Sequence, residues 1–345
     1  MIHNYLLLMA ALLLSGCSTL SWYGQAVQGQ YEIWELQKPI GSLLDDPLTP
    51  DQLAKRLRTA NEIRLFAVME MQLPDNDSYT SFADLQRDSV LWAVFAADQD
   101  SIELKQWCYP LVGCVGYRGF FAEEDAAKLT TKLRQQGLDV YISPVPAYST
   151  LGWFTDPLLN TFINWPTPYL AELILHELAH QQLYIEDDSR FNESFATAVA
   201  EEGVRRWLEK NHAAPSTLKG YEQAVQSNRQ IIALALKTRG QLEVLYASQL
   251  TLDEKMRQKK IYLESLFTQI SSLNGLSDHM ASSWRYEKLN NARLGAIATY
   301  YDLVPAFKKL IEQSHGDMQL FYQQAKRIGR LSLSERQQAL VELLE

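Results

Sequence analysis

One five-residue motif constrains this chain more than any other feature: the pattern H-E-x-x-H, which runs from His176 to His180. Residues four apart lie above one another on one face of a helix, so the two histidines can direct their imidazoles at one cation. Glu177 is rotated by about 100° from His176. Its carboxylate can therefore lie beside the cation and accept a proton from a water molecule that the cation binds. The motif predicts a zinc site on a helix; the alternative is a chance match, with both histidines hydrogen-bonded in a core.

The flanking residues favour a helix around the motif. Thr167 can serve as the N-cap and Pro168 as the first helical residue, where the missing N–H costs nothing. Glycine is absent from Pro168 to Ile185, and apolar side chains such as Leu173 and Leu178 surround the histidines. Such surroundings lower the local dielectric, so a bound cation would act strongly on its neighbours.

A third ligand is expected, because a catalytic zinc normally takes three protein ligands and keeps one position open. Glu193 follows His180 with twelve residues between them. Asp187, Asp188 and Ser189 can supply a turn and a helix N-cap in that interval. Two antiparallel helices joined by this turn would bring Glu193 to the histidine pair, and we predict that it completes the site.

Other roles for these carboxylates remain open. Glu201 and Glu202 lie two turns further along and are alternative ligands. Glu193 could instead be an exposed first-turn residue that complements the helix dipole. The metzincin pattern is excluded, because it needs Gly and His three and six residues after the second histidine, where this chain has Leu183 and Glu186.

The amino-terminal residues have the pattern of a bacterial lipoprotein signal. The apolar run over residues 5–14 suits a secretory signal and is too short to span a bilayer, which takes about 20 residues. The sequence Leu-Ser-Gly-Cys over residues 14–17 resembles the lipobox, whose cysteine is lipidated and begins the mature chain. We expect a signal peptide over residues 1–16 and a lipid anchor on Cys17 at the periplasmic face of the cell envelope. Ser18 resembles a signal for sorting to the outer membrane; an ordinary cleaved signal or an uncleaved anchor is the alternative.

Two further cysteines, Cys108 and Cys114, lie close together in the sequence. A lipoprotein faces an oxidising compartment, where disulfides persist. Pro110 and Gly113 favour a turn, so the two sulfur atoms can meet in a small loop. We predict a disulfide. A metal site is the alternative, although the spacing is not C-x-x-C and no histidine lies nearby.

Composition and charge limit the fold and the partners. The chain has 345 residues, of which 47% are hydrophobic, enough to bury the core of one large domain or of two coupled ones. The net charge of −9 does not fit nucleic-acid binding, for which a basic surface is expected. We expect an α+β fold with a small α/β region over residues 17–150 and a mainly helical, zincin-like core over residues 151–345, joined as one continuous unit.

The small α/β region is predicted from alternating patterns of strand and helix residues. Strands are expected over residues 89–97, 115–121 and 138–143. A helix is expected over residues 122–136, with acidic residues first and basic residues later, and Gly137 ends it.

Most of the remaining chain is predicted to be helical. Residues 23–48 are expected to form a helix and an extended connection. Residues 150–154 are a candidate for an exposed strand that pairs with an extended substrate, with a turn as the alternative. Capping boxes at Thr49, Thr251 and Ser332 are each expected to begin a helix, the first running to about residue 72 and the second to about residue 273. Two further helices are expected over residues 218–248 and 286–313.

The motifs outside the H-E-x-x-H helix lie at residues 107–114, 117–121, 148–154, 192–196, 290–294 and 300–305. Together they resemble the putative zinc aminopeptidase family of Gram-negative lipoproteins over nearly all of the mature chain. More distantly, the H-E-x-x-H motif and Asn192-Glu193 are similar to thermolysin-like and aminopeptidase N-like peptidases. The resemblance implies peptide substrates, one zinc ion per chain on His176, His180 and Glu193, and Glu177 as general base.

Two hypotheses about function follow. In the first, a zinc peptidase of the aminopeptidase type, Tyr300 or Tyr301 is a candidate donor to the oxyanion, with core packing as the alternative role of both. Glu201 or Glu202 would bind the substrate ammonium. In the second hypothesis, the chain is a non-catalytic envelope lipoprotein that acts as a binding or scaffold module with a structural zinc. Glu177 favours the first, because a structural site has no use for a general base.

Overall fold

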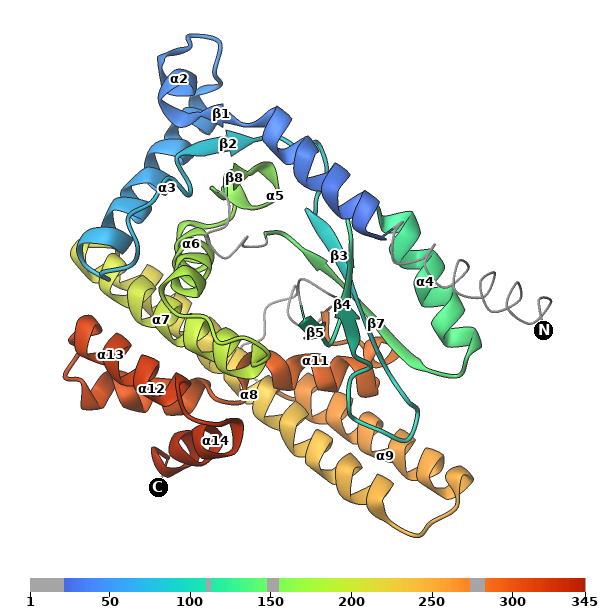
Figure 1. The fold of residues 1–345 in the computed structure, drawn as a ribbon. Helices are drawn as coiled ribbons and strands as arrows, with labels where there is room; N and C mark the ends of the chain where they lie inside the picture. Colours follow the sequence, from blue (N-terminus) through green and yellow to red (C-terminus); the bar gives the residue numbers. More distant parts are fainter. Residues whose placement is uncertain (1–21, 110–112, 148–154, 274–282, 345) are drawn as a thin grey trace, which may run out of the picture.

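The computed structural model describes residues 22–109, 113–147, 155–273 and 283–344, with the backbone alone at residues 299 and 300. The fold is α+β and mainly helical, as predicted, with a small α/β layer beside a larger group of helices (Figure 1). The largest hydrophobic core takes residues from both predicted regions, beginning at Ile33 and ending at Leu340.

The α/β layer contains a three-stranded antiparallel sheet of order β6-β3-β7. Successive side chains of a strand point to opposite faces, so Val94 packs with residues of α4 while Phe95 packs with residues of α11. Strand β3 is apolar along its length because both faces of the sheet are covered. These elements are β3 (Leu91–Ala97), β6 (Arg118–Phe120), α4 (Glu123–Gln135), β7 (Asp139–Val145) and α11 (Asn291–Tyr301).

The predicted single strand over residues 115–121 is wrong. Strand β5 (Gly113–Val115) pairs with β4 (Trp107–Tyr109) in a hairpin, whereas β6 pairs with β3. The chain changes partner at Gly116 and Tyr117, so one continuous run of residues serves two sheets. The residue pattern indicates that a segment tends to be extended, but it does not indicate which strand will pair with that segment.

The chain before β3 forms a helix over residues 22–36 and a short sheet of order β1-β2-β8. The predicted capping box at Thr49 is wrong: Pro50 is the N-cap of α3, and no side chain accepts a hydrogen bond there. Thr49 lies one residue too early, in a turn where its N–H donates to Asp46 O at 3.0 Å. The elements are β1 (Lys38–Pro39), α2 (Ile40–Asp45), α3 (Asp51–Met69), β2 (Ser81–Ala83), β8 (Leu158–Leu159) and α5 (Asn160–Ile163).

Two helices at the centre of the molecule, α6 (Thr167–Gln182) and α7 (Ser189–Lys210), pack against each other and run in opposite directions. Helix α6 has Pro166 as its N-cap, one residue earlier than predicted, so Pro168 is the second helical residue. The predicted helix around the H-E-x-x-H motif is otherwise confirmed.

Close packing of α6 and α7 depends on a glycine. An added Cβ at Gly203 would lie 2.8 Å from Leu175 Cδ1 and 3.3 Å from Met71 Cε. A larger residue would therefore push α7 away from both α6 and the end of α3. On its other side α7 packs through Phe195, whose ring lies 5.7 Å from that of Phe307.

The predicted helix over residues 286–313 is wrong, because three elements occupy it. Asn290 caps α11 by accepting a hydrogen bond from Arg293 N at 3.0 Å. Pro305 lies in the first turn of α12, and because proline has no backbone N–H it cannot donate the hydrogen bond to residue 301 that would continue α11. The capping boxes at Thr251 and Ser332 are confirmed.

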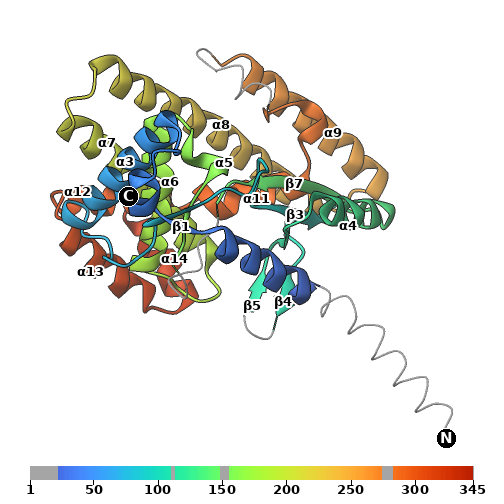
Figure 2. The same cartoon turned by 90° about the horizontal axis from the view of Figure 1, so that it is seen from above.

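The helices after α7 complete the larger group, and α8 and α9 lie side by side as a long pair (Figure 2). They are α8 (Pro215–Ala247), α9 (Leu252–Ser271), the 3-10 helix η1 (Tyr286–Lys288), α11, α12 (Val304–Gln313), α13 (Met318–Gly329) and α14 (Leu333–Glu342).

Asp188 provides a stability test, because it connects the start of α7 to α14. Its carboxylate caps α7 and forms a buried ion pair with Arg336 at 2.5 Å. We expect Asp188→Ala to lower the free energy of unfolding by about 3–5 kcal/mol, since it leaves a buried charge unpaired. Ser332→Ala, which removes an exposed N-cap, should cost only about 1 kcal/mol. Urea denaturation compares the two; equal losses would mean that the contact with Arg336 does not stabilise the fold.

Candidate active site

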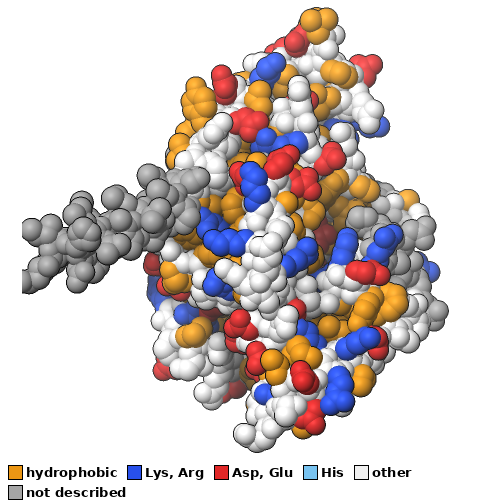
Figure 3. Space-filling view, turned by 90° about the vertical axis from the view of Figure 1, so that its right-hand side faces the viewer, with side chains coloured by type: hydrophobic (Ala, Val, Ile, Leu, Met, Phe, Trp, Pro, Cys, Tyr) orange, Lys and Arg blue, Asp and Glu red, His pale blue; other side chains and the backbone are white. Residues whose placement is uncertain are grey.

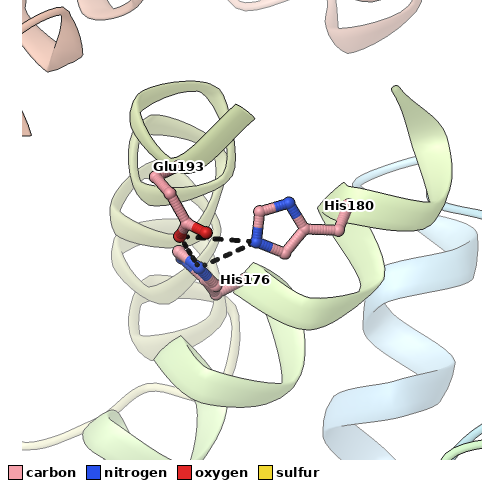
Figure 4. Close-up of side chains that lie close together, drawn as sticks. All are labelled: His176, His180 and Glu193. Atoms are coloured by element: carbon pink, nitrogen blue, oxygen red, sulfur yellow. Dashed lines mark hydrogen bonds and ion pairs between the residues drawn. The ribbon is translucent and has the colours of Figure 1, made fainter. Parts of the chain in front are cut away.

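Three side chains from α6 and α7 converge on one point (Figure 4). His176 Nε2 lies 3.2 Å from Glu193 Oε2, and His180 Nε2 lies 3.6 Å from the same oxygen. The two imidazole Nε2 atoms are 3.1 Å apart. Bonds of about 2.0–2.2 Å at tetrahedral angles put neighbouring zinc ligands about 3.4 Å apart. The three side chains can therefore hold a metal ion between them.

The turn between the two helices sets the position of Glu193. Asp187 has a φ of 59°, and Asp188 caps α7 by accepting a hydrogen bond from a backbone N–H of the first turn at 3.0 Å. Asn192 is buried and binds both backbone groups of Ile185: it accepts from N at 2.8 Å and donates to O at 2.7 Å. These bonds fix the start of α7 against the end of α6, so Glu193 faces the histidines.

Glu193 carries a negative charge in this group. Burial alone would raise the pKa of its carboxyl, but hydrogen bonds and positive charge from His176 and His180 lower the pKa to about 2. A metal ion can replace the imidazole protons as the positive partner, since metal binding releases protons from its ligands. The side chains of His176 and Glu193 are 21% and 22% exposed, so the group is open to solvent on one side.

Glu177 lies beside the group, next to His176 on α6, and is partly buried like His176 and Glu193. Burial raises the pKa of its carboxyl to about 7; His176 opposes this shift, while Glu193 and Asp156 add to it. Asp156 is buried and accepts a hydrogen bond from Gln181 Nε2 at 3.3 Å. No pattern in the sequence indicates Asp156, because only the folded chain brings the segment before β8 against this part of α6.

Two tyrosines from other elements lie near the group. Tyr117, in the connection between β5 and β6, is 37% exposed as a whole, but loss of hydration around its hydroxyl and the charges of Glu193 and Glu177 raise its pKa to about 12. Tyr301, at the end of α11, has its pKa raised to about 12, chiefly by burial and the charge of Glu172 and less by Glu201 and Glu193, although a hydrogen bond with Asn228 lowers it. Tyr301 was a predicted candidate, whereas the only sequence signal for Tyr117 was its place in one family motif.

The acidic residues predicted to bind the substrate ammonium lie in ion pairs of their own. Glu201 pairs with Arg229 and Lys308. Glu202 pairs with two arginines of its own helix, each at 2.7 Å. Both glutamates line a cavity of about 540 Å³ whose lining does not include the three metal-binding side chains. Neither residue is positioned as the third ligand.

Glu172 is a carboxylate that the sequence analysis missed. It lies four residues before His176, so it shares a face of α6 with His176 and His180. Burial and the charge of Glu201 raise the pKa of Glu172 to about 7, while His176 and the nearby Tyr221 hydroxyl lower it. Within the described ranges, no lysine or arginine nitrogen lies within 4.0 Å of its carboxylate. The sequence feature that could have indicated Glu172 is its position four residues before His176, the same spacing that separates His176 from His180.

The predicted disulfide between Cys108 and Cys114 is present and closes the β4–β5 hairpin. Gly113 in this hairpin has a φ of 78°, and an added Cβ would lie 2.8 Å from Asp187 Oδ1. The hairpin therefore touches the turn between the two helices that carry the metal-binding side chains. The chain then continues from β5 to Tyr117.

Several predicted features lie outside the described residues: the signal peptide and Cys17, the candidate strand over residues 150–154, and the side chain of Tyr300. Among the helices that the structure describes, none combines the length and the apolar character needed to cross a bilayer.

The fold and the site define a mainly helical α+β protein with a three-residue group between two packed helices that could hold a metal ion. The model of the family described as "Putative aminopeptidase" matches residues 21–340, and the chain belongs to this family. No curated protein and no solved structure matches the chain. Membership of the family supports a peptidase function with peptides as substrates.

Metal analysis tests the three-residue group. We expect His176→Ala, His180→Ala and Glu193→Ala each to reduce the zinc bound per chain, because each removes one of three ligands. Glu201→Ala is the matched control, since it removes a carboxylate from the same helix as Glu193 and outside the group. Mass spectrometry of metals in the purified variants gives the stoichiometry. Zinc retained by Glu193→Ala and lost from Glu201→Ala would contradict the proposed third ligand.

Proposed function

We propose that the protein is a zinc-dependent peptidase with one zinc ion per chain. The observation that supports this most directly is the convergence of His176, His180 and Glu193, with Glu177 adjacent to the first of them. Two imidazoles and a carboxylate are the ligands of a well-known class of catalytic zinc sites. When bound there, zinc would lower the pKa of a water molecule and polarise the carbonyl of the substrate.

Glu177 is the proposed general base. Its carboxylate would accept a proton from the attacking water and transfer it to the leaving amine. The position on α6 suits this role, because Glu177 is turned away from the ligand face by about 100°. Asp156 and Gln181 fix the surroundings of this carboxylate through their mutual hydrogen bond.

A tyrosine hydroxyl is the proposed donor to the oxyanion that forms during peptide hydrolysis. Such a donor has to face the point where negative charge develops. Tyr117 fits better than Tyr301, because its surroundings include both Glu177 and Glu193, whereas Tyr301 already bonds Asn228. Tyr117 also comes from the α/β layer, just after the hairpin that touches the turn between α6 and α7.

Glu172 is the proposed partner of the substrate ammonium in an aminopeptidase. A free amino terminus lies close to the scissile carbonyl, so its binding group has to be near the metal. One turn of helix, about 5.4 Å, separates Glu172 from His176. Glu201 lies eight residues beyond Glu193 on α7, about 12 Å along the axis, and is held by two cations.

Replacing the base while keeping the ligands separates catalysis from metal binding. We expect Glu177→Gln to keep zinc at the wild-type level, because the substituted side chain is not a ligand. Peptide hydrolysis should fall by about 10²–10⁴-fold, the usual loss when a general base is removed. Metal content and cleavage of a peptide library are measured on the same samples. If wild type binds zinc and cleaves no peptide, the chain is better explained as a non-catalytic binding or scaffold module.

The ammonium partner is tested with paired substrates. We expect Glu172→Gln to lower kcat/KM for a peptide with a free amino terminus by about 10- to 100-fold, the value of a charge-assisted hydrogen bond. The acetylated form of the same peptide should be cleaved equally poorly by wild type and variant. Glu202→Gln, which weakens ion pairs with two arginines of the same helix, is the control and should preserve the preference for the free amine. Equal rates on both substrates in wild type would indicate an endopeptidase.

We also propose that Cys17 carries a lipid anchor and that the protein lies on the periplasmic face of a membrane, with the outer membrane favoured by Ser18. The lipobox over residues 14–17 and the preceding apolar run support this proposal. A lipid anchor holds a protein at a bilayer without a membrane-spanning helix.

The anchor is tested by substitution of the acylated residue. We expect Cys17→Ser to appear in the soluble fraction or to remain unprocessed, because the side chain that accepts the lipid is lost. Membrane fractionation and the intact mass of the protein measure the two outcomes. A variant that is processed and fractionates like wild type would rule out lipidation at this cysteine.

A further inference from the structure

The helix over residues 22–36 presents an apolar stripe to solvent. Val27 is 69% exposed, Tyr31 60% and Trp34 42%. Their spacing of four and three residues places the three side chains on one face of the helix. Figure 3 shows hydrophobic side chains at the edge of the molecule near the point where the described chain begins. A row of apolar groups on one helix face marks an interaction surface.

The opposite face of this helix is fixed to the α/β layer. Trp22 Nε1 donates a hydrogen bond to Gly119 O at 2.8 Å, and the ring of Phe121 lies directly against the backbone at Gly29. Ile33 is 2% exposed and belongs to the largest hydrophobic core. The helix therefore has a defined orientation, and the apolar stripe faces outward.

Two glutamates lie near the stripe. Glu32 is the only charged residue between Val27 and Trp34 in the sequence. Its carboxylate is bound by Arg87 Nη1 through both oxygens, at 2.9 and 2.8 Å. Glu35, four residues after Tyr31, is exposed at the edge of the stripe, so the stripe consists of apolar and aromatic groups with one acidic residue at its border.

The distance to the proposed anchor identifies the occupant. Cys17 lies five residues before Trp22, so the start of the helix is at most about 18 Å from the lipidated residue. A surface this close to the acyl chains is held near the bilayer at high effective concentration. Tyr and Trp are the side chains favoured at a membrane interface, where the ring is apolar and one polar group stays hydrated.

We propose that the helix over residues 22–36 lies on the bilayer surface, with Val27, Tyr31 and Trp34 in the interfacial region of the lipid. This inference rests on the proposed lipid anchor and is independent of the peptidase chemistry. The lipid on Cys17 would attach the protein to the bilayer, and the apolar stripe would set the orientation of the protein on the bilayer surface. The helix packs against β6 and Phe121. Binding of the helix to the bilayer would therefore also fix the orientation of the α/β layer, which carries Tyr117, relative to the membrane.

Fluorescent labels on the full lipidated chain test the proposal. Val27→Cys and Tyr31→Cys are each labelled with an environment-sensitive dye, since the other cysteines are in the disulfide or in the proposed lipid linkage. The matched control is Val244→Cys, which replaces a 74% exposed valine on α8. A second control, Gln28→Cys, lies on the same helix and is rotated by about 100° from position 27. The protein is bound to vesicles of phosphatidylethanolamine and phosphatidylglycerol, with and without nitroxide-labelled lipid.

We expect a blue shift of the dye emission and several-fold stronger quenching by nitroxide lipid at positions 27 and 31 than at position 244, with an intermediate result at position 28. Vesicle-bound protein whose labels at 27 and 31 are quenched no more than the label at 244 would overturn the inference and leave the anchor intact. Protein that does not float with vesicles would overturn the anchor and the docked helix together. A blue shift that appears without vesicles and grows with protein concentration would assign the stripe to a second copy of the chain.

Discussion

The packing of α6 against α7 is the constraint on which the rest of the structure depends. Helix α6 alone can align His176 and His180, but the third metal-binding group arrives only because α7 runs back along it. The side chain of Asn192 and the cap at Asp188 fix that return within a few residues. The ligand atoms all lie within 4.8 Å of one another, so a slide of one helix by a single turn, about 5.4 Å, would break the group.

The three side chains that could hold a metal ion come from one part of the fold, and the two tyrosines near them come from others. Helices α6 and α7 supply the imidazoles and the carboxylates. The hairpin closed by Cys108 and Cys114 meets the turn between these helices and continues to Tyr117. Helix α11 packs on the sheet beside Phe95 and ends at Tyr301. The positions of His176, His180 and Glu193 thus depend on two packed helices, whereas the positions of the two tyrosines depend on packing across the whole core.

Carboxylates near the group differ in charge state because their partners differ. Hydrogen bonds from two histidines lower the pKa of Glu193, whereas burial raises the pKa of Glu177 and Glu172 although His176 opposes the shift of both. Glu201, two turns along α7, pairs with two cations, yet burial raises its pKa above the usual value as well. Four acidic residues of similar sequence environment thus have different electrostatic surroundings, and the difference comes from residues far away in the chain.

The sequence by itself determined the features whose causes are local. The histidine spacing follows from 3.6 residues per turn, a turn and an N-cap within residues 187–189 follow from their short polar side chains, and the disulfide follows from a short turn between two cysteines. The predictions of one strand over residues 115–121 and one helix over residues 286–313 were wrong. Strand pairing and helix breaks depend on contacts with other parts of the chain, which the residue pattern does not specify. Only the tertiary structure brought Tyr117, Asp156 and Glu172 to the site. Their neighbours come from distant parts of the chain, and long-range packing, unlike helical periodicity, leaves no fixed spacing in the sequence.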